Sequence, residues 1–308
     1  MSVGVAGAAA ARAAPPAGQS TVVSGPAGRN RVFASAAISA VAGAGGVTRI
    51  PVLASQVPLV LRRTADAVYL VGGAAGPIGG DELSLRIDVG PGAFLRLRTA
   101  AASIALPGLD GLESVLRVSV SVEAGGRLEY LPEPVVVAAG ARHATVVSVT
   151  LAAGASLMLR DELLLGRHGE AGGAARSVLR ADYAGRPLLR QSLSVSGTDP
   201  ASLGPAVLSG HRGVGTLLQV DPALGSGSVR ASNPSAVVAD RTIVGSEAGV
   251  AAVGSEVEVA AVAGQPTVAV MPLAGPAVLV TALANDAVTL RRRLSAAGLG
   301  RDGGLGGG

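Results

Sequence analysis

The chain has 308 residues, 49% of them hydrophobic, which is enough apolar material for one large domain or two small ones. It contains no Cys and all 25 of its basic residues are Arg, so disulfides, zinc–thiolate sites, Schiff-base lysines and phosphate-binding P-loops are excluded. The formal charge is only +4 and aromatic residues make up 2%, so nucleic-acid binding lacks both a basic patch and a stacking platform.

The two ends of the chain differ from its middle. Residues 1–28 are rich in Ala and Gly and lack the basic start and continuous apolar run of a signal peptide. We expect an irregular, disordered leader there and a flexible Gly-rich tail over residues 299–308. The remaining residues, 29–298, are predicted to form a single domain.

The middle of the chain is predicted to consist of β-strands. Glu82–Val89 alternates apolar and polar residues, and Val115–Val122 and Ala144–Leu151 show related patterns of period two. Such alternation is typical of strands with one face in a core and one face in water. With 45 Gly and 18 Pro between Val-rich runs, the composition favours an all-β fold.

A weak internal repeat organises these strands. Three segments each contain an alternating strand, a turn at Gly92, Gly125 or Gly154, and a second strand that begins two or three residues later. Glycine suits a turn that requires a positive φ angle. We therefore predict an all-β fold with minor α content, built of stacked strand–turn–strand coils as in a β-helix or a two-layer sheet.

The repeat also predicts which side chains are stacked. Eight residues beyond each turn glycine lie Ala100, Glu133 and Glu162, which we expect above one another, with Asp161 and Glu129 close by. Neighbouring carboxylates repel each other unless they are solvated, paired or bound to a metal. Solvated turn acids are one interpretation, and a cation path or a partner contact is the other.

The C-terminal third contains a long uncharged stretch, Val259–Asn285. Prolines and glycines divide it into pieces of strand length, so we interpret it as buried strands and not as a membrane-spanning helix. A short helix is expected at Pro200–Leu208.

The last predicted element is a helix over AVTLRRRLSAAGL. Asn285 or Asp286 can cap its first turn, and Val288, Leu290 and Leu294 form an apolar stripe along it. A helix is thus expected to close the domain.

Residues suited to catalysis are sparse. The three histidines, His143, His168 and His211, form no metal-binding or nucleophile–base pattern, and no serine stands in a nucleophile elbow. A hydrolase that uses His168 or His211 remains an alternative, but we predict that the chain is not an enzyme.

Several segments in order resemble the family of the urease accessory protein UreD, also called UreH. They are YLVGGAAGPIGGDEL from Tyr69, GAFLRLRT from Gly92, LEYLPEP from Leu128, DELLLGRHGE from Asp161 and LRADYAGRPLL from Leu179. Each segment alone is weak evidence, whereas five in the family's order are fairly specific.

The resemblance implies an all-β stack of strands with a little helix, and a cytoplasmic role in loading nickel into urease. It implies binding to urease apoprotein and to the accessory proteins F and G, of which G is a GTPase. No nucleic acid and no membrane is expected as a partner. No cofactor is expected to be tightly bound, and nickel(II) is expected in transit through an internal passage. A structural or surface-binding β-solenoid without a metal role is the alternative.

Nickel(II) accepts carboxylate, carbonyl, imidazole and water ligands, and a passage should hold the ion loosely. Five carboxylates are therefore the candidate nickel-path residues: Asp81, Glu133, Asp161, Glu162 and Glu170. For Asp81 the alternative is a turn carboxylate that accepts backbone N–H bonds. Arg167 is expected to pair with Glu170 or Asp161 as structural support.

Overall fold

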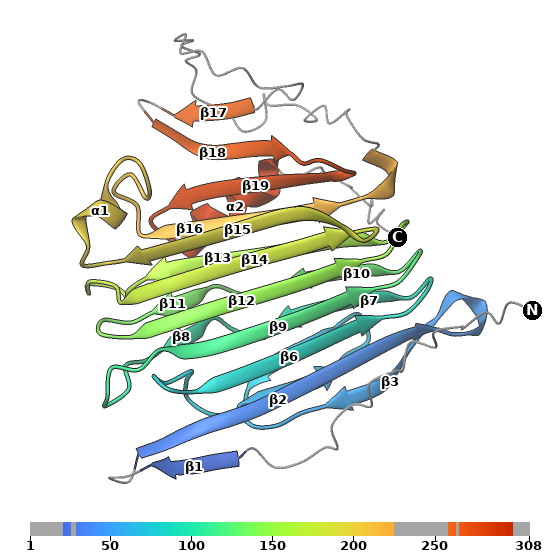
Figure 1. The fold of residues 1–308 in the computed structure, drawn as a ribbon, viewed down its shortest axis with the longest axis horizontal. Coiled ribbons are helices and arrows are strands. Elements are labelled where there is room, and N and C mark those ends of the chain that lie inside the picture. The colour runs from blue at the N-terminus through green and yellow to red at the C-terminus, as the bar shows by residue number, and fades with distance from the viewer. Residues whose placement is uncertain (1–20, 26–28, 225–257, 263–264, 298–308) are drawn as a thin grey trace, which may run out of the picture.

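The computed structural model describes residues 21–25, 29–224, 258–262 and 265–297. Within these residues the chain folds into two stacked β-sheets with two helices (Figure 1). The eight-stranded sheet consists of β1 (Thr21–Gly25), β2 (Arg29–Ala42), β3 (Thr48–Ala54), β6 (Glu82–Val89), β9 (Ser114–Val122), β12 (Arg142–Leu151), β14 (Ala174–Tyr183) and β15 (Arg186–Ser196). This architecture confirms the predicted fold class.

The eleven-stranded sheet lies against the first. It consists of β4 (Leu59–Arg63), β5 (Val68–Gly72), β7 (Phe94–Thr99), β8 (Ser103–Ala105), β10 (Arg127–Leu131), β11 (Val135–Val137), β13 (Ser156–Leu165), β16 (Gly213–Val220), β17 (Glu258–Val262), β18 (Gln265–Pro272) and β19 (Ala277–Ala284). The two helices are α1 (Pro200–Leu203) and α2 (Ala287–Ala297), and short 3-10 turns occupy Ala44–Gly46 and Pro222–Leu224.

The chain alternates between the two sheets as it advances. Strands β6, β9, β12 and β14 add one after another to the first sheet, and β7, β10 and β13 add in parallel to the second. Turns at Gly92, Gly125 and Gly154 join the sheets, with φ angles of 65°, 69° and 81°. The predicted stack of coils with glycine turns is therefore confirmed.

The register of the coils changes at the predicted stack of side chains. Arg127 pairs with Phe94 on one side and with Ser156 on the other, whereas Val135 pairs with Ser103 and Leu163, so the register shifts by one residue between β10 and β11. Glu133 lies in this interruption and is not paired in either ladder. Glu133 and Glu162 are nevertheless brought together, because both bond the Arg291 guanidinium.

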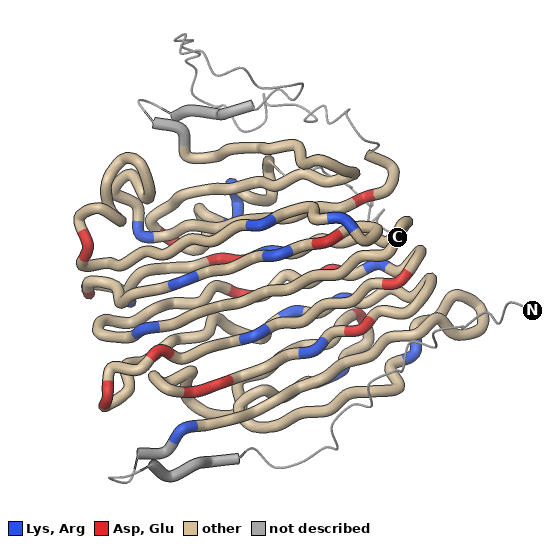
Figure 2. Tube along the Cα trace, in the orientation of Figure 1, with Lys and Arg blue, Asp and Glu red and all other residues tan. Residues whose placement is uncertain are grey.

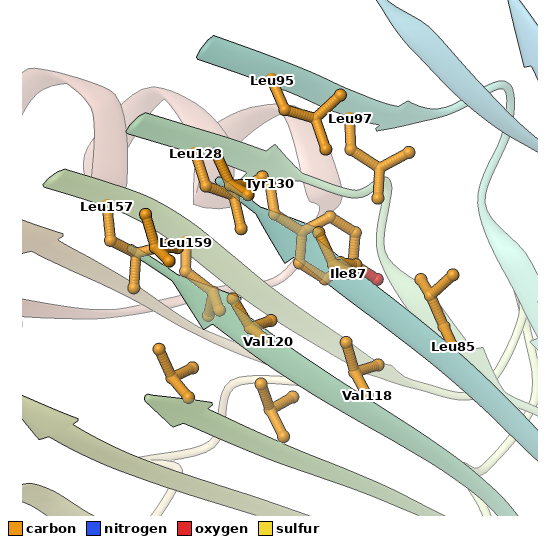
Figure 3. Close-up of a cluster of buried hydrophobic side chains, with 14 of the residues drawn as sticks. Leu85, Ile87, Leu95, Leu97, Val118, Val120, Leu128, Tyr130, Leu157 and Leu159 are labelled. Atoms are coloured by element: carbon orange, nitrogen blue, oxygen red, sulfur yellow. The ribbon is translucent and has the colours of Figure 1, made fainter. Parts of the chain in front are cut away.

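The main core fills the space between the sheets. Figure 3 shows leucines of β7, β10 and β13 facing Leu85, Ile87, Val118 and Val120 of the opposite sheet. Leu, Val and Ala do almost all of this packing, as the low aromatic content requires. Tyr130 is an exception, and its ring lies within the same cluster.

Helix α2 packs on the other face of the eleven-stranded sheet, against β16 and β19. Asp286 begins it by accepting a hydrogen bond from the Thr289 N–H at 2.8 Å, as predicted. Leu290 and Leu294 are fully buried, but Val288 is 76% exposed, so the predicted stripe is wrong at its first member. The sheet-facing side of the helix carries Arg291 instead.

Further predictions concern the two ends of the chain, the short helix after β15 and membrane-spanning helices. Strand β1 lies within the stretch 1–28 that was predicted to be an irregular leader, and the rest of that stretch and the predicted tail lie outside the described residues. The short helix predicted from Pro200 ends at Leu203 instead of Leu208. Among the described helices none is long and apolar enough to cross a membrane.

Charged residues are distributed over the strands and their ends, with both signs interspersed (Figure 2). On the eight-stranded sheet, for example, Arg86 pairs with Asp88 at 2.7 Å and Arg117 with Glu82 at 3.2 Å. These exposed pairs make the outer surface of the sheet hydrophilic and contribute little to the stability of the fold.

Candidate functional site

Two of the five candidate carboxylates lie in turns. Asp81 is 3% exposed and accepts hydrogen bonds from the N–H groups of Val32, at 3.0 Å, and Ile78, at 2.9 Å. Glu170 accepts from Arg167, whose Nε lies 2.8 Å from Glu170 Oε1, and this pair is the predicted one. The hydrogen bond from Arg167 lowers the pKa of Glu170 to about 2. Both carboxylates thus hold a turn together.

Glu133 and Glu162 lie on the sheet face under α2. The Arg291 guanidinium bonds both carboxylate oxygens of Glu133, at 2.9 and 2.8 Å, and Glu162 Oε2 at 3.0 Å. Arg160 Nε lies 3.2 Å from Glu162 Oε2. Burial raises the pKa of Glu162, although the neighbouring arginines oppose the shift.

The eleven-stranded sheet is interrupted beside this cluster, between β10 and β11, where LEYLPEP leaves the strand. Arg160 bonds the carbonyl oxygens of Pro132, at 2.8 Å, and of Leu131, at 3.4 Å. The Glu133 N–H donates to Thr99 Oγ1 at 2.7 Å. Because prolines on both sides of Glu133 cannot donate to a ladder, these side chains satisfy the polar groups of the interruption.

A cavity of about 560 Å³ opens at the interruption. It is lined by inward-facing residues of both sheets, including Tyr130 and Thr145, and also by Glu133 and Glu162. The exposed Ala101 lines it as well, so the cavity reaches the surface.

Asp161 points in the opposite direction from its neighbour Glu162. Along β13 it stands between Leu159 and Leu163, which belong to two different apolar clusters between the sheets. Its carboxylate accepts a hydrogen bond from Ser177 of the opposite sheet. Burial raises the pKa of Asp161, and the Ser177 hydrogen bond only partly opposes this.

Asp161 belongs to a row of polar side chains that runs across the strands. In the register, Asp161 of β13 pairs with Thr216 of β16, and Thr216 pairs with Thr281 of β19. On the opposite sheet, Thr145 of β12 pairs with Ser177 of β14. We call these five residues the polar belt. It separates the two apolar clusters.

A second cavity, of about 420 Å³, follows the belt toward the edge strands. It is lined by Ser177, Thr216, Thr281 and the exposed Ser192, and by Asp161, which also lines the first cavity. Thr281 Oγ1 is buried and has no hydrogen-bond partner among the described protein atoms. Asp161 thus lines both cavities, and exposed residues line each of them.

His143 lies at the start of the belt, in the lining of the first cavity. Its Nδ1 is 2.9 Å from Ser114 Oγ and its Nε2 is 3.2 Å from Thr145 Oγ1. Burial lowers its pKa to about 4, so the imidazole is neutral at pH 7. Of the other histidines, His211 bonds the Leu208 carbonyl oxygen at 3.0 Å and His168 lies exposed in the loop after β13.

The belt offers hydroxyl oxygens and one carboxylate to a solute between the sheets, whereas both ring nitrogens of the neighbouring His143 are already hydrogen-bonded. These oxygens are acceptable ligands for a hard or borderline divalent cation. In the part of the chain that the structure describes, no three His, Asp or Glu side chains gather into a metal-binding group. The polar belt is therefore suited to weak contacts with a cation, made one after another, and not to a closed coordination site.

Sequence reasoning named Asp161 but missed the four hydroxyl residues of the belt. Each is a single hydroxyl at an inward position of its strand, and one Ser or Thr among apolar residues is too common to stand out. They could have been found by aligning the predicted strands in register and looking for polar residues that pair across neighbouring strands.

Comparisons with known proteins identify the family of this chain. The model of the family described as UreD urease accessory protein matches residues 34–302. The urease accessory protein UreD of Frankia alni is 42% identical over 87% of this chain and 93% of its own length. Those of a Parafrankia species and of Streptomyces coelicolor are 41% and 40% identical, each over 86% of this chain. The chain therefore belongs to the UreD family of urease accessory proteins.

Proposed function

We propose that this chain conducts nickel(II) between its two sheets to urease apoprotein, along the polar belt and past Asp161. The observation that carries the proposal is that one half-buried carboxylate, that of Asp161, lines both cavities, each of which also has exposed lining residues. The proposed route between the cavities runs past this carboxylate. The protein itself acts as a scaffold without catalysis, in the cytoplasm, with urease apoprotein and the accessory proteins F and G as its partners.

The chemistry of the belt favours transit over storage. Ser and Thr hydroxyls are weak neutral ligands, whereas a single carboxylate supplies an attractive charge without closing a coordination sphere. Because burial raises the pKa of Asp161, its protonated form is stabilised while no cation is present. A passing cation favours the ionised form of this carboxylate.

The test replaces Asp161 in cells that express the urease operon. Asp161→Asn keeps the shape of the side chain and removes its charge, so nickel per purified urease should fall about tenfold or more while the accessory complex still assembles. Asp182→Asn is the matched control, because Asp182 is exposed and paired with Arg190 on the outer surface. It should leave the nickel content unchanged.

Two results contradict the proposal. Full nickel content with Asp161→Asn removes Asp161 from the route. Active, nickel-filled urease in cells that lack this chain rules out the loading function altogether. Copurification of urease with each variant separates a loss of transit from a loss of assembly.

A further inference from the structure

Besides Asp161, a pair of carboxylate residues borders the first cavity. Glu133 and Glu162 occur on neighbouring coils, and Arg291 of α2 bridges them with three hydrogen bonds of 2.8–3.0 Å. Both residues line the 560 Å³ cavity. A single guanidinium therefore bridges the carboxylates of two residues that border this cavity.

The cluster leaves one carboxylate oxygen unused. The Glu162 side chain is 0% exposed, yet Glu162 Oε1 has no hydrogen-bond partner among the described protein atoms, and neither has Arg291 Nε. A buried carboxylate oxygen without a partner is costly, and natural proteins seldom keep one without a reason. Glu162 thus has a free electron-pair donor that points to a ligand other than Arg291.

The two arginines of the cluster differ in how firmly they are held. Arg160 is 10% exposed in its side chain and is bonded to the carbonyl oxygens of Leu131 and Pro132. The Arg291 side chain is 32% exposed. Because Leu290 and Leu294 anchor α2, the Arg291 guanidinium can swing into water without unseating the helix.

We propose that Glu133 and Glu162 form a divalent-cation site whose resident occupant is the Arg291 guanidinium, which a cation from the first cavity must displace. With Arg291 away, two carboxylates beside Arg160 leave one net negative charge and several free oxygens, which suit a divalent metal ion. The proposal rests on the proposed function in that it takes nickel(II) as the cargo that reaches this cavity. By competing for the same carboxylates, Arg291 limits how tightly Glu133 and Glu162 can bind nickel(II).

The experiment measures nickel(II) binding to the full-length chain, purified with its co-expressed partners, by equilibrium dialysis. Arg291→Met removes the guanidinium but keeps an apolar stem on the helix. It should add one site that binds nickel at least about tenfold more tightly than the corresponding site of the wild type, because a competing positive charge is gone. Arg292→Met, the exposed neighbour on the same helix, is the matched control and should bind like the wild type.

A double variant, Arg291→Met with Glu162→Gln, should lose the added site. No gain in Arg291→Met overturns the proposal, and so does a gain that persists in the double variant. Thermal unfolding of each variant verifies that the chain is folded. Since the readout is binding and not urease loading, it is independent of the Asp161→Asn experiment, and each proposal can fail without the other.

Discussion

Among the residues of the site, Arg160 is the one whose replacement should lower the free energy of unfolding most. Replacing it with Met removes the ion pair to Glu162, at 3.2 Å, and the bonds to the carbonyls of Leu131 and Pro132. The Arg160 side chain is 10% exposed and that of Glu162 is 0% exposed, so water cannot replace these partners. Removing one partner of a buried pair costs about 3–5 kcal/mol.

Arg291 still contacts Glu162 in this variant, which places the expected loss near 3 kcal/mol. For a chain of this size that corresponds to a fall in melting temperature of about 5 °C. The assay is urea or thermal unfolding of the full-length chain, followed by circular dichroism. Arg117→Met is the control, because Arg117 and Glu82 are about half exposed and their pair should contribute less than about 1 kcal/mol.

A loss in Arg160→Met no larger than that in Arg117→Met would refute the reasoning. It would mean that the interruption between β10 and β11 needs no side chain to satisfy its carbonyl groups. The cavity would then owe its shape to Pro132 and Pro134 alone.

Two further predictions concern stability. The pKa of His143 is about 4 in the folded chain and 6.5 in the unfolded chain, so stability should fall by about 3 kcal/mol as the pH drops from 6.5 to 4, and His143→Gln should remove that dependence in unfolding curves. At Gly173 a Cβ atom would lie 2.2 Å from the Ala141 carbonyl oxygen, so Gly173→Ala should cost about 1–3 kcal/mol. Gly72→Ala, whose nearest contact is 3.8 Å, should unfold within about 0.5 kcal/mol of the wild type.

Local pattern was sufficient to predict the strands and the stacking of coils. Glu82–Val89 alternates cleanly because one face meets the core and the other meets water, and the structure has a strand with these bounds. The turn glycines were identified by their spacing, since each needs a positive φ angle that other residues avoid. These features depend only on neighbours in sequence.

The direction of Asp161 was available from the alternation of β13, but the surroundings of Glu162 were not. Asp161 lies on the same face of the strand as Leu157, Leu159 and Leu163, which are buried between the sheets. Glu162 lies on the other face, which alternation alone would assign to solvent. Its burial there depends on α2, which the chain reaches more than 100 residues later.

The error at Val288 has a simpler origin. Successive residues of an α-helix are about 100° apart around its axis, so Leu290 and Leu294 share one face while Val288 lies on roughly the opposite side from Leu290. The structure buries Leu290 and Leu294 and leaves Val288 in solvent, as this spacing requires. The period of the helix, applied strictly, would have excluded Val288 from the stripe.

The polar belt costs the core some stability, and the fold limits that cost by its layout. The belt crosses the strands at one level, so that Leu159 and Leu163 still pack into separate apolar clusters on its two sides. Each cluster keeps several fully buried Leu, Val or Ala side chains, which stabilise the stack even where Asp161 and its neighbours interrupt the packing. A transverse row of small hydroxyl side chains is therefore compatible with a stable stack, whereas the same residues spread along one strand would remove that strand from the core.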